Sequence, residues 1–152
     1  MSIIFAAPGK YIQGRGELRV LSRHISGLGK KALVIASTLG VERIQSAMQG
    51  ADCSACALHF VTFEGECSMT EINRMQRIFT DEGCDIVVGA AGGKVMDTAK
   101  ATACFLHAPC VIIPTAVSSD APCSALSVIY HDDGSLDRRL ALPKSPDIVL
   151  VD

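Results

Sequence analysis

Segment 85–106 limits the folds open to this chain more than any other part of it. Residues 85–88 have the pattern of a strand buried on both faces, and they lead through the glycine-rich turn 89–93, GAAGG, into a helical pattern over 94–106. A helix that follows a buried strand across so short a turn is typical of parallel sheets, in which helices cross over from one strand to the next. We therefore expect an α/β fold.

The rest of the chain repeats this alternation. Further strands are predicted at 32–36, 57–63, 110–113 and 148–151, and further helices at 17–28, 41–48 and after a capping box formed by Ser68 and Glu71. Strands at 125–130 and 136–142 flank the turn sequence HDDGS and predict a β-hairpin. Together these patterns predict a Rossmann-like, mostly parallel sheet with helices on both faces and one hairpin, forming a single domain over 1–152.

The composition argues against several classes of protein. The chain is 49% hydrophobic and has 14 Lys and Arg against 16 Asp and Glu, without a basic cluster. We expect a packed core, and neither a nucleic-acid nor a membrane partner. The apolar part of the N-terminal segment MSIIFAAPGKY is too short for a signal peptide, and no apolar run reaches membrane-spanning length. The protein is expected to be soluble and cytoplasmic.

The cysteines and histidines show no complete metal-binding pattern. The seven cysteines are expected to be reduced and to pack as small core residues. Cys53 and Cys56 have zinc-ligand spacing, but neither a second pair nor closely spaced histidines follow. The four histidines are scattered, at His24, His59, His107 and His131. We predict no metal site in this chain.

The turn between strand and helix is the first candidate binding site. Gly92 and Gly93 let a ligand approach the backbone, and the free N–H groups and dipole of a helix N-terminus favour an anion such as a pyrophosphate. The segment is neither a GxGxxG fingerprint nor a Walker A loop, because Val95 follows Lys94 where that loop needs Ser or Thr. Taken alone, it also fits a turn that binds nothing.

A polar loop is the second candidate. Segment 114–130, PTAVSSDAPCSALSVIY, places the carboxylate of Asp120 in a loop beyond the end of a strand, where ligands bind in open α/β sheets. The same loop carries four hydroxyl side chains, those of Thr115, Ser118, Ser119 and Ser124. Hydroxyls suit phosphate, ribose and amide groups, and Asp120 can accept hydrogen bonds from a polyol. Alternatively, these side chains only satisfy the backbone of the loop.

Together, the two segments resemble the glycerol dehydrogenase branch of the iron- and zinc-dependent alcohol dehydrogenase superfamily. The likeness is carried by GGKxxDxAK at 92–100 and PTxxSxDAPxSALSVIY at 114–130, and it extends to PGKYIQG at 8–14, GECS at 65–68 and the closing PDIVLVD. It covers nearly the whole chain. It implies an enzyme that oxidises glycerol, or a similar small vicinal diol, by hydride transfer to NAD.

The resemblance also implies a role for each matching residue. Asp120 would lie beside the substrate hydroxyls. The cofactor would contact the pyrophosphate-binding Gly92, Gly93, Lys94 and Asp97, the nucleotide-binding Thr115 and Ser118, and, toward the nicotinamide, Ser124, Leu126 and Tyr130. An alternative for Lys94 is a pair with Asp97 alone, on the next turn of the helix.

Two positions depart from the family pattern. Ala91 replaces the first of three glycines, which costs on the order of 1 kcal/mol if that position needs a positive φ and nothing otherwise. Ser37 replaces an aspartate that accepts hydrogen bonds from the adenosine ribose. A neutral serine does not repel a 2′-phosphate, so we expect weaker selectivity for NAD over NADP.

The resemblance further implies a catalytic metal, zinc in the full-length family, held by one aspartate and two histidines of a helical C-terminal domain. None of the 152 residues matches those positions. We therefore expect a truncated dinucleotide-binding domain, inactive by itself, that forms homo-oligomers through surface left uncovered. The alternative is a truncated protein that binds nucleotide, or only associates with other subunits, without catalysis.

Overall fold

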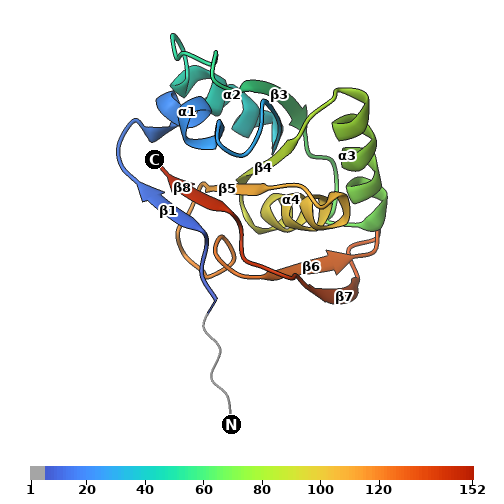
Figure 1. The fold of residues 1–152 in the computed structure, drawn as a ribbon. Coiled ribbons are helices and arrows are strands. Elements are labelled where there is room, and N and C mark those ends of the chain that lie inside the picture. The colour runs from blue at the N-terminus through green and yellow to red at the C-terminus, as the bar shows by residue number, and fades with distance from the viewer. Residues whose placement is uncertain (1–5) are drawn as a thin grey trace.

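Six parallel strands form the centre of the computed structural model, which describes residues 6–152 (Figure 1). The strands are β1 (Lys10–Gln13), β2 (Lys31–Ala36), β3 (Ala57–Thr62), β4 (Ile86–Ala91), β5 (Cys110–Pro114) and β8 (Ile148–Val151), in the spatial order β1-β8-β5-β4-β2-β3. The parallel sheet is as predicted. Residues 1–5, part of the segment tested for a signal peptide, lie outside the described residues.

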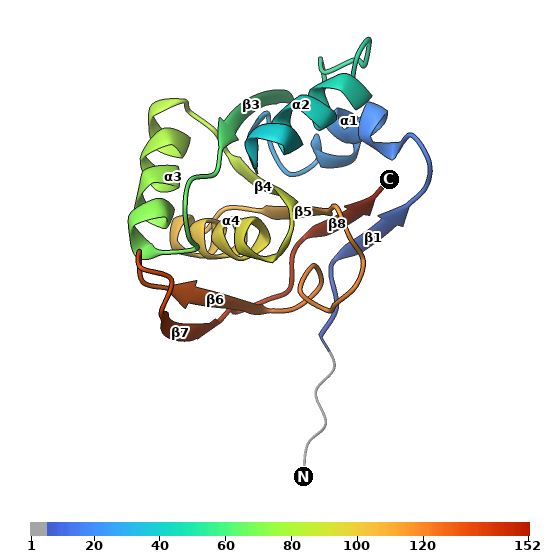
Figure 2. The same cartoon turned by 180° about the vertical axis from the view of Figure 1, so that it is seen from behind.

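Helices cover both faces of this sheet (Figures 1 and 2). They are the 3₁₀ turn Glu17–Val20 with α1 (Leu21–Ile25) and α2 (Thr38–Ala47) on one face, and α3 (Met69–Asp81) with α4 (Gly93–Leu106) on the other. The core is divided accordingly, because successive strand residues point to opposite faces: Val34 packs toward α1 and α2, and Leu33 and Ile35 toward α3 and α4. None of the described helices is long and apolar enough to cross a membrane.

The predicted hairpin is present and packs on the second helical layer. It consists of β6 (Leu126–Tyr130) and β7 (Leu136–Ala141), which pair with each other in antiparallel fashion. Ile129 is fully buried against Ile72 of α3 and Ala101 of α4. The N–H of Tyr130 also donates to the carbonyl of Cys67 at 2.8 Å, so the hairpin is tied to the segment that leads into α3.

Several boundaries differ from the predictions for local reasons. The helix predicted at 17–28 is divided into a 3₁₀ turn and a short α-helix that ends before Gly27. Helix α2 begins three residues earlier than predicted, because the Ser37 hydroxyl caps it by accepting a hydrogen bond from the Gly40 N–H at 3.1 Å. Ser68 caps α3 as predicted. The Glu71 carboxylate, however, accepts from the Glu64 N–H at 2.9 Å, so the capping box is not reciprocal.

The glycine-rich turn is shorter than the sequence predicted. Residues 89–91 belong to β4, where Ala91 pairs with Pro114 of β5, and only Gly92 separates the strand from α4. Ala91 is not among the described residues with positive φ. The alanine at this position therefore causes no backbone strain, so the cost expected for a positive φ does not arise.

Candidate functional site

A cleft of about 820 Å³ opens at the carboxyl ends of β2, β4 and β5. Its floor includes Ala90, Ala91 and Pro114, and its walls include residues of α2 and the first turn of α4. The helix after β2 and the helix after β4 cover opposite faces of the sheet, so the cleft lies at a topological switch point, the usual ligand position in open α/β sheets. A second cleft, of about 350 Å³, lies at the opposite end of β5, near Pro109. We assign the site to the larger cleft on these grounds.

The N-terminus of α4 presents unpaired hydrogen-bond donors to this cleft. The first hydrogen bond of the helix runs from the Met96 N–H to the Gly92 carbonyl at 3.1 Å. Among residues 6–152, no acceptor is present for the N–H groups of Gly93, Lys94 and Val95, all of which line the cleft. Three free donors at the positive end of a helix dipole form a site for an anion.

The space above the turn is open. A Cβ added to Gly92 or Gly93 would meet no atom within 4 Å, and neither residue has a positive φ. Neither the packing nor the backbone conformation of the chain therefore requires glycine at these two positions. Room at the backbone, together with free amides, fits a diphosphate that lies directly against the turn.

Five of the residues predicted to bind the cofactor line the cleft: Ser37, Gly92, Gly93, Lys94 and Thr115. Lys94 pairs with Glu66, with 2.6 Å between its Nζ and a carboxylate oxygen. The alternative pairing of Lys94 with Asp97 alone is therefore wrong.

Asp97 is held by the protein instead of facing the cleft. Its carboxylate lies 3.0 Å from the Nζ of Lys100 and accepts from the Val128 N–H at 3.1 Å, so it joins α4 to β6. Only 14% of its side chain is exposed.

Lys100 is a site-supporting residue that the sequence reasoning missed. Its side chain is 1% exposed, and besides Asp97 its ammonium reaches the carbonyls of Ala121 (3.0 Å) and Leu126 and the hydroxyl of Ser124 (3.4 Å). These contacts fix the end of the 115–125 loop against α4. The available signal was the position of Lys100 beside Ala99 in the apolar stripe of the helix.

The other predicted residues of segment 114–130 do not line the cleft. Ser118 and Asp120 are exposed on the loop, and the carbonyl of Asp120 accepts from the N–H groups of Cys123 (2.9 Å) and Ser124 (3.0 Å). Leu126 and Tyr130 belong to β6. The fold brings the glycine turn together with Ser37 and Thr115. It does not bring the turn together with the other five predicted positions, which are Ser118, Asp120, Ser124, Leu126 and Tyr130.

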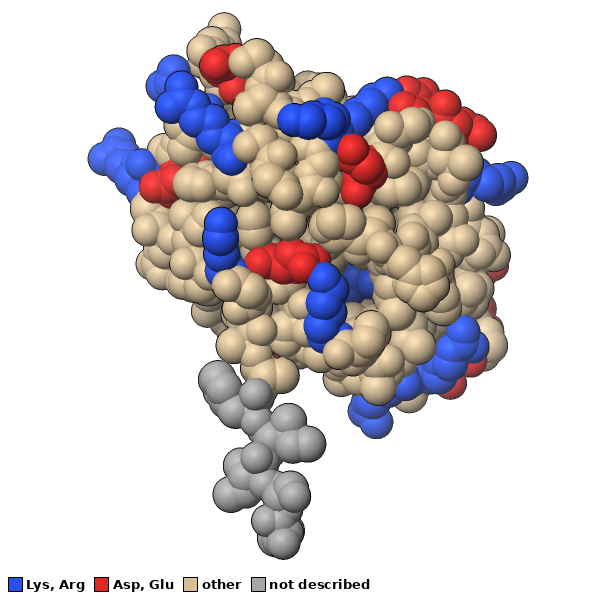
Figure 3. Space-filling view, in the orientation of Figure 1, with Lys and Arg blue, Asp and Glu red and all other residues tan. Residues whose placement is uncertain are grey.

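Two charged residues of the cleft were also missed. Arg43 is exposed on α2, six residues after Ser37, and forms no ion pair with any residue from 6 to 152. Asp152 is already engaged, because its carboxylate accepts from the N–H groups of Gly16 (2.8 Å) and Leu18 (2.9 Å). On the α2 side of the cleft, the charged side chain without an ion-pair partner among residues 6–152 is therefore the positively charged Arg43. Elsewhere, the face in Figure 3 mixes acidic and basic side chains without a broad patch of one sign.

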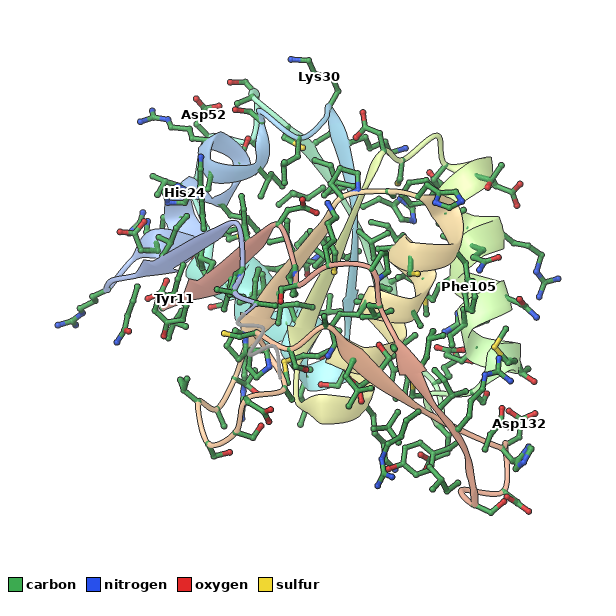
Figure 4. The ribbon with its side chains drawn as sticks, turned by 60° about the horizontal axis from the view of Figure 1, so that its bottom comes forward. Tyr11, His24, Lys30, Asp52, Phe105 and Asp132 are labelled. Carbon is green, nitrogen blue, oxygen red and sulfur yellow. The ribbon has the colours of Figure 1, made fainter. Side chains whose placement is uncertain are left out.

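Within residues 6–152, no three His, Cys, Asp or Glu side chains come together as a group that could hold a metal ion. His24 pairs with Glu17 at 2.7 Å and lies on the opposite side of the molecule from Asp132 in the hairpin turn (Figure 4). Cys53 and Cys56 are free thiols, like the other five cysteines.

The chain is similar to known dehydrogenases along nearly its whole length. Residues 8–152 match the family model described as "Iron-containing alcohol dehydrogenase". Glycerol dehydrogenase of Escherichia coli O6:H1 is 42% identical over 100% of this chain, and that of Thermotoga maritima is 43% identical over 95%. The crystal structure of a probable glycerol dehydrogenase from Sinorhizobium meliloti 1021 superposes with a TM-score of 0.89 at 39% identity, covering 99% of this chain and 41% of that one. This chain spans 42% and 40% of the length of the two curated relatives.

Proposed function

Because the chain belongs to the iron-containing alcohol dehydrogenase family, we propose that its cleft is the dinucleotide-binding site of an NAD-dependent glycerol dehydrogenase. The observation that carries this proposal is the turn at Gly92 and Gly93. There, three backbone N–H groups without protein acceptors meet a space that no side chain fills. A diphosphate supplies the negative charge and the acceptors that such a turn lacks.

Each part of the cleft then has a role in holding the cofactor. The amides of Gly93, Lys94 and Val95 bind the diphosphate, and the Lys94 ammonium adds a charge-assisted contact. The Thr115 hydroxyl, at the end of β5, is available to a ribose or amide group of the nucleotide. Bound NAD supplies the hydride acceptor for oxidation of the secondary hydroxyl of glycerol or a similar diol.

The loop over 115–125 supplies the proposed substrate contact. The Asp120 carboxylate, exposed on this loop, accepts hydrogen bonds from the substrate hydroxyls, and Lys100 keeps the loop in register with α4 and therefore with the glycine turn. Ser118 would contact the nucleotide together with Thr115, whereas Ser124, Leu126 and Tyr130 would contact the cofactor toward its nicotinamide. The metal expected from the family has no ligand set among residues 6–152, so no step is assigned to it.

Cofactor choice follows from the charges at the β2 end of the cleft. Ser37 is neutral, and its hydroxyl already accepts from the Gly40 N–H. Arg43, which also lines the cleft, forms no ion pair with any residue from 6 to 152. Acidic side chains at this position favour the ribose hydroxyls of NAD, whereas an arginine accommodates a 2′-phosphate. We propose that the site accepts NADP as well as NAD.

Calorimetric titration of the 152-residue chain with NAD, and then with ADP-ribose as competitor, tests the proposal. One site per chain that both compounds occupy is the expected result, and a crystal soaked in NAD should show the diphosphate on the Gly92–Gly93 turn. A turn left vacant in that crystal would overturn the assignment. Glycerol oxidation, assayed with added zinc, tests the further proposal that this chain alone binds the nucleotide without catalysis.

A further inference from the structure

Lys94 is bound to a carboxylate that does not itself line the cleft. The Lys94 Nζ is 2.6 Å from a Glu66 carboxylate oxygen. The lysine side chain is 56% exposed and lines the cleft at the start of α4, whereas the Glu66 side chain is 22% exposed and lies on the segment between β3 and α3. The ion pair thus connects the glycine-rich turn to a neighbouring loop.

The two partners differ in their freedom to move. The backbone around Glu66 is held on both sides, by hydrogen bonds from the Glu64 N–H to Glu71 (2.9 Å) and from the Tyr130 N–H to Cys67 (2.8 Å). Lys94 projects from its helix on a flexible, largely exposed four-carbon side chain. When the pair separates, it is therefore the lysine that moves.

We propose that Glu66 competes with the bound nucleotide for Lys94 and thereby promotes nucleotide release. This inference rests on the proposed function, because it requires a diphosphate at the turn. A lysine ammonium has two anions within its reach: the fixed carboxylate when the cleft is empty, and the diphosphate when it is filled. An ion pair this exposed contributes little to stability. A diphosphate that also accepts hydrogen bonds from three backbone N–H groups therefore displaces Glu66 readily from Lys94.

The competition has a consequence for turnover. Each nucleotide that leaves returns Lys94 to Glu66, so the carboxylate lowers the free energy of the empty cleft and with it the affinity for the cofactor. Because product release limits the turnover of many enzymes, a residue that weakens cofactor binding through faster release raises the rate of exchange. Glu66 is a positioning residue in this scheme, because it acts through Lys94 and does not touch the nucleotide.

Binding of NADH to four forms of the 152-residue chain tests this role: wild type, Glu66→Gln, Lys94→Ala and the double variant. Affinity is measured by NADH fluorescence, and the release rate by stopped-flow displacement with excess ADP-ribose. We expect Glu66→Gln to bind NADH about two- to fivefold more tightly, mainly through slower release. Lys94→Ala should bind more weakly, and adding Glu66→Gln to it should produce no gain. Glu64→Gln removes the same charge two residues away and should leave affinity within about twofold of wild type.

The remaining outcomes would each overturn the inference. Unchanged or weaker binding by Glu66→Gln would show that the carboxylate does not compete for the lysine. An equal gain in the Lys94→Ala background would show that Glu66 acts on the nucleotide directly. If wild-type protein bound no NADH, the proposed function itself would fail, whereas binding without a gain in Glu66→Gln would leave that function standing and reject only the competition.

Discussion

Gly89 of β4 and Ala99 of α4 lie so close together that a Cβ on Gly89 would be 2.5 Å from the Ala99 Cβ. This contact sets the separation of strand and helix directly below the glycine-rich turn. A Cβ added to Gly92 or Gly93, in contrast, would meet no atom within 4 Å. Within one short segment, therefore, one glycine is required by the packing of the protein and two are not.

Replacing Gly89 with alanine should destabilise the protein. The new methyl group must push β4 and α4 apart, and overpacking of this kind costs about 1–3 kcal/mol. Urea denaturation followed by circular dichroism measures the change in the free energy of unfolding. A Gly89→Ala variant as stable as wild type would contradict the close contact.

Replacing Gly92 with alanine should have the opposite pattern of effects. Stability should stay within about 0.5 kcal/mol of wild type, since the methyl group meets no atom of the chain. NADH binding should weaken by about tenfold or more, because the methyl group occupies the space assigned to the diphosphate. Gly27→Ala, where a Cβ also meets nothing, is the matched control and should change neither property.

Cofactor selectivity should depend on Ser37 and Arg43. Wild-type protein is expected to bind NAD and NADP with dissociation constants within about tenfold of each other. Ser37→Asp should weaken NADP binding selectively, and so should Arg43→Ala, each by about five- to fiftyfold. Arg77→Ala, on the exposed face of α3, is the control for removal of a positive charge. A strong preference of the wild type for NAD would remove this prediction.

Lys100→Met should destabilise the fold by about 3 kcal/mol, because it leaves the largely buried Asp97 carboxylate and two carbonyls without their cation. Asp97→Asn keeps an acceptor for the Val128 N–H but leaves the buried Lys100 ammonium without its carboxylate, so it should also destabilise the fold. Hydrogen exchange followed by mass spectrometry should show faster exchange in the Lys100→Met variant over the 115–125 loop and β6. Unchanged protection there would show that Lys100 does not hold the loop.

Alkaline pH should weaken the protein through two thiols. Burial raises the pKa of Cys67 from 9.0 to about 11, and that of Cys110 from 9.0 to about 12. Between pH 9 and the raised pKa of each thiol, the unfolded chain loses a proton that the folded chain retains. The free energy of unfolding therefore falls as the pH rises above 9, by about 1.4 kcal/mol per pH unit for each thiol. Urea titrations at pH 8, 9 and 10 should show this slope, and Cys67→Ala should reduce it.

The sequence predicted the parallel sheet and the glycine turn because both depend on local patterns. Strands β2, β4 and β5 are continuous apolar runs, and α4 follows directly from its glycines. Strand β1 was missed because its four residues, KYIQ, have no such run and acquire their conformation by pairing with β8.

The partners of charged side chains could not be predicted in the same way. Helical spacing suggested Asp97 as the partner of Lys94, but the fold brings Glu66 to Lys94 from 28 residues away and leaves Asp97 for Lys100. The Lys100 network also depends on how the 115–125 loop returns to α4, which no local pattern records. The sequence pointed to the glycine-rich turn, Ser37 and Thr115, which line the cleft, whereas the wall formed by α2 and the contacts among the charged side chains required the fold.

The pairing of β1 with β8 constrains how the chain is made. Lys10 lies opposite Ile148, so β1 emerges from the ribosome long before β8, which is its only neighbour in the sheet among residues 6–152 (Figures 1 and 2). Until then its N–H and C=O groups are free to pair with other nascent chains, so aggregation during synthesis can begin at this strand.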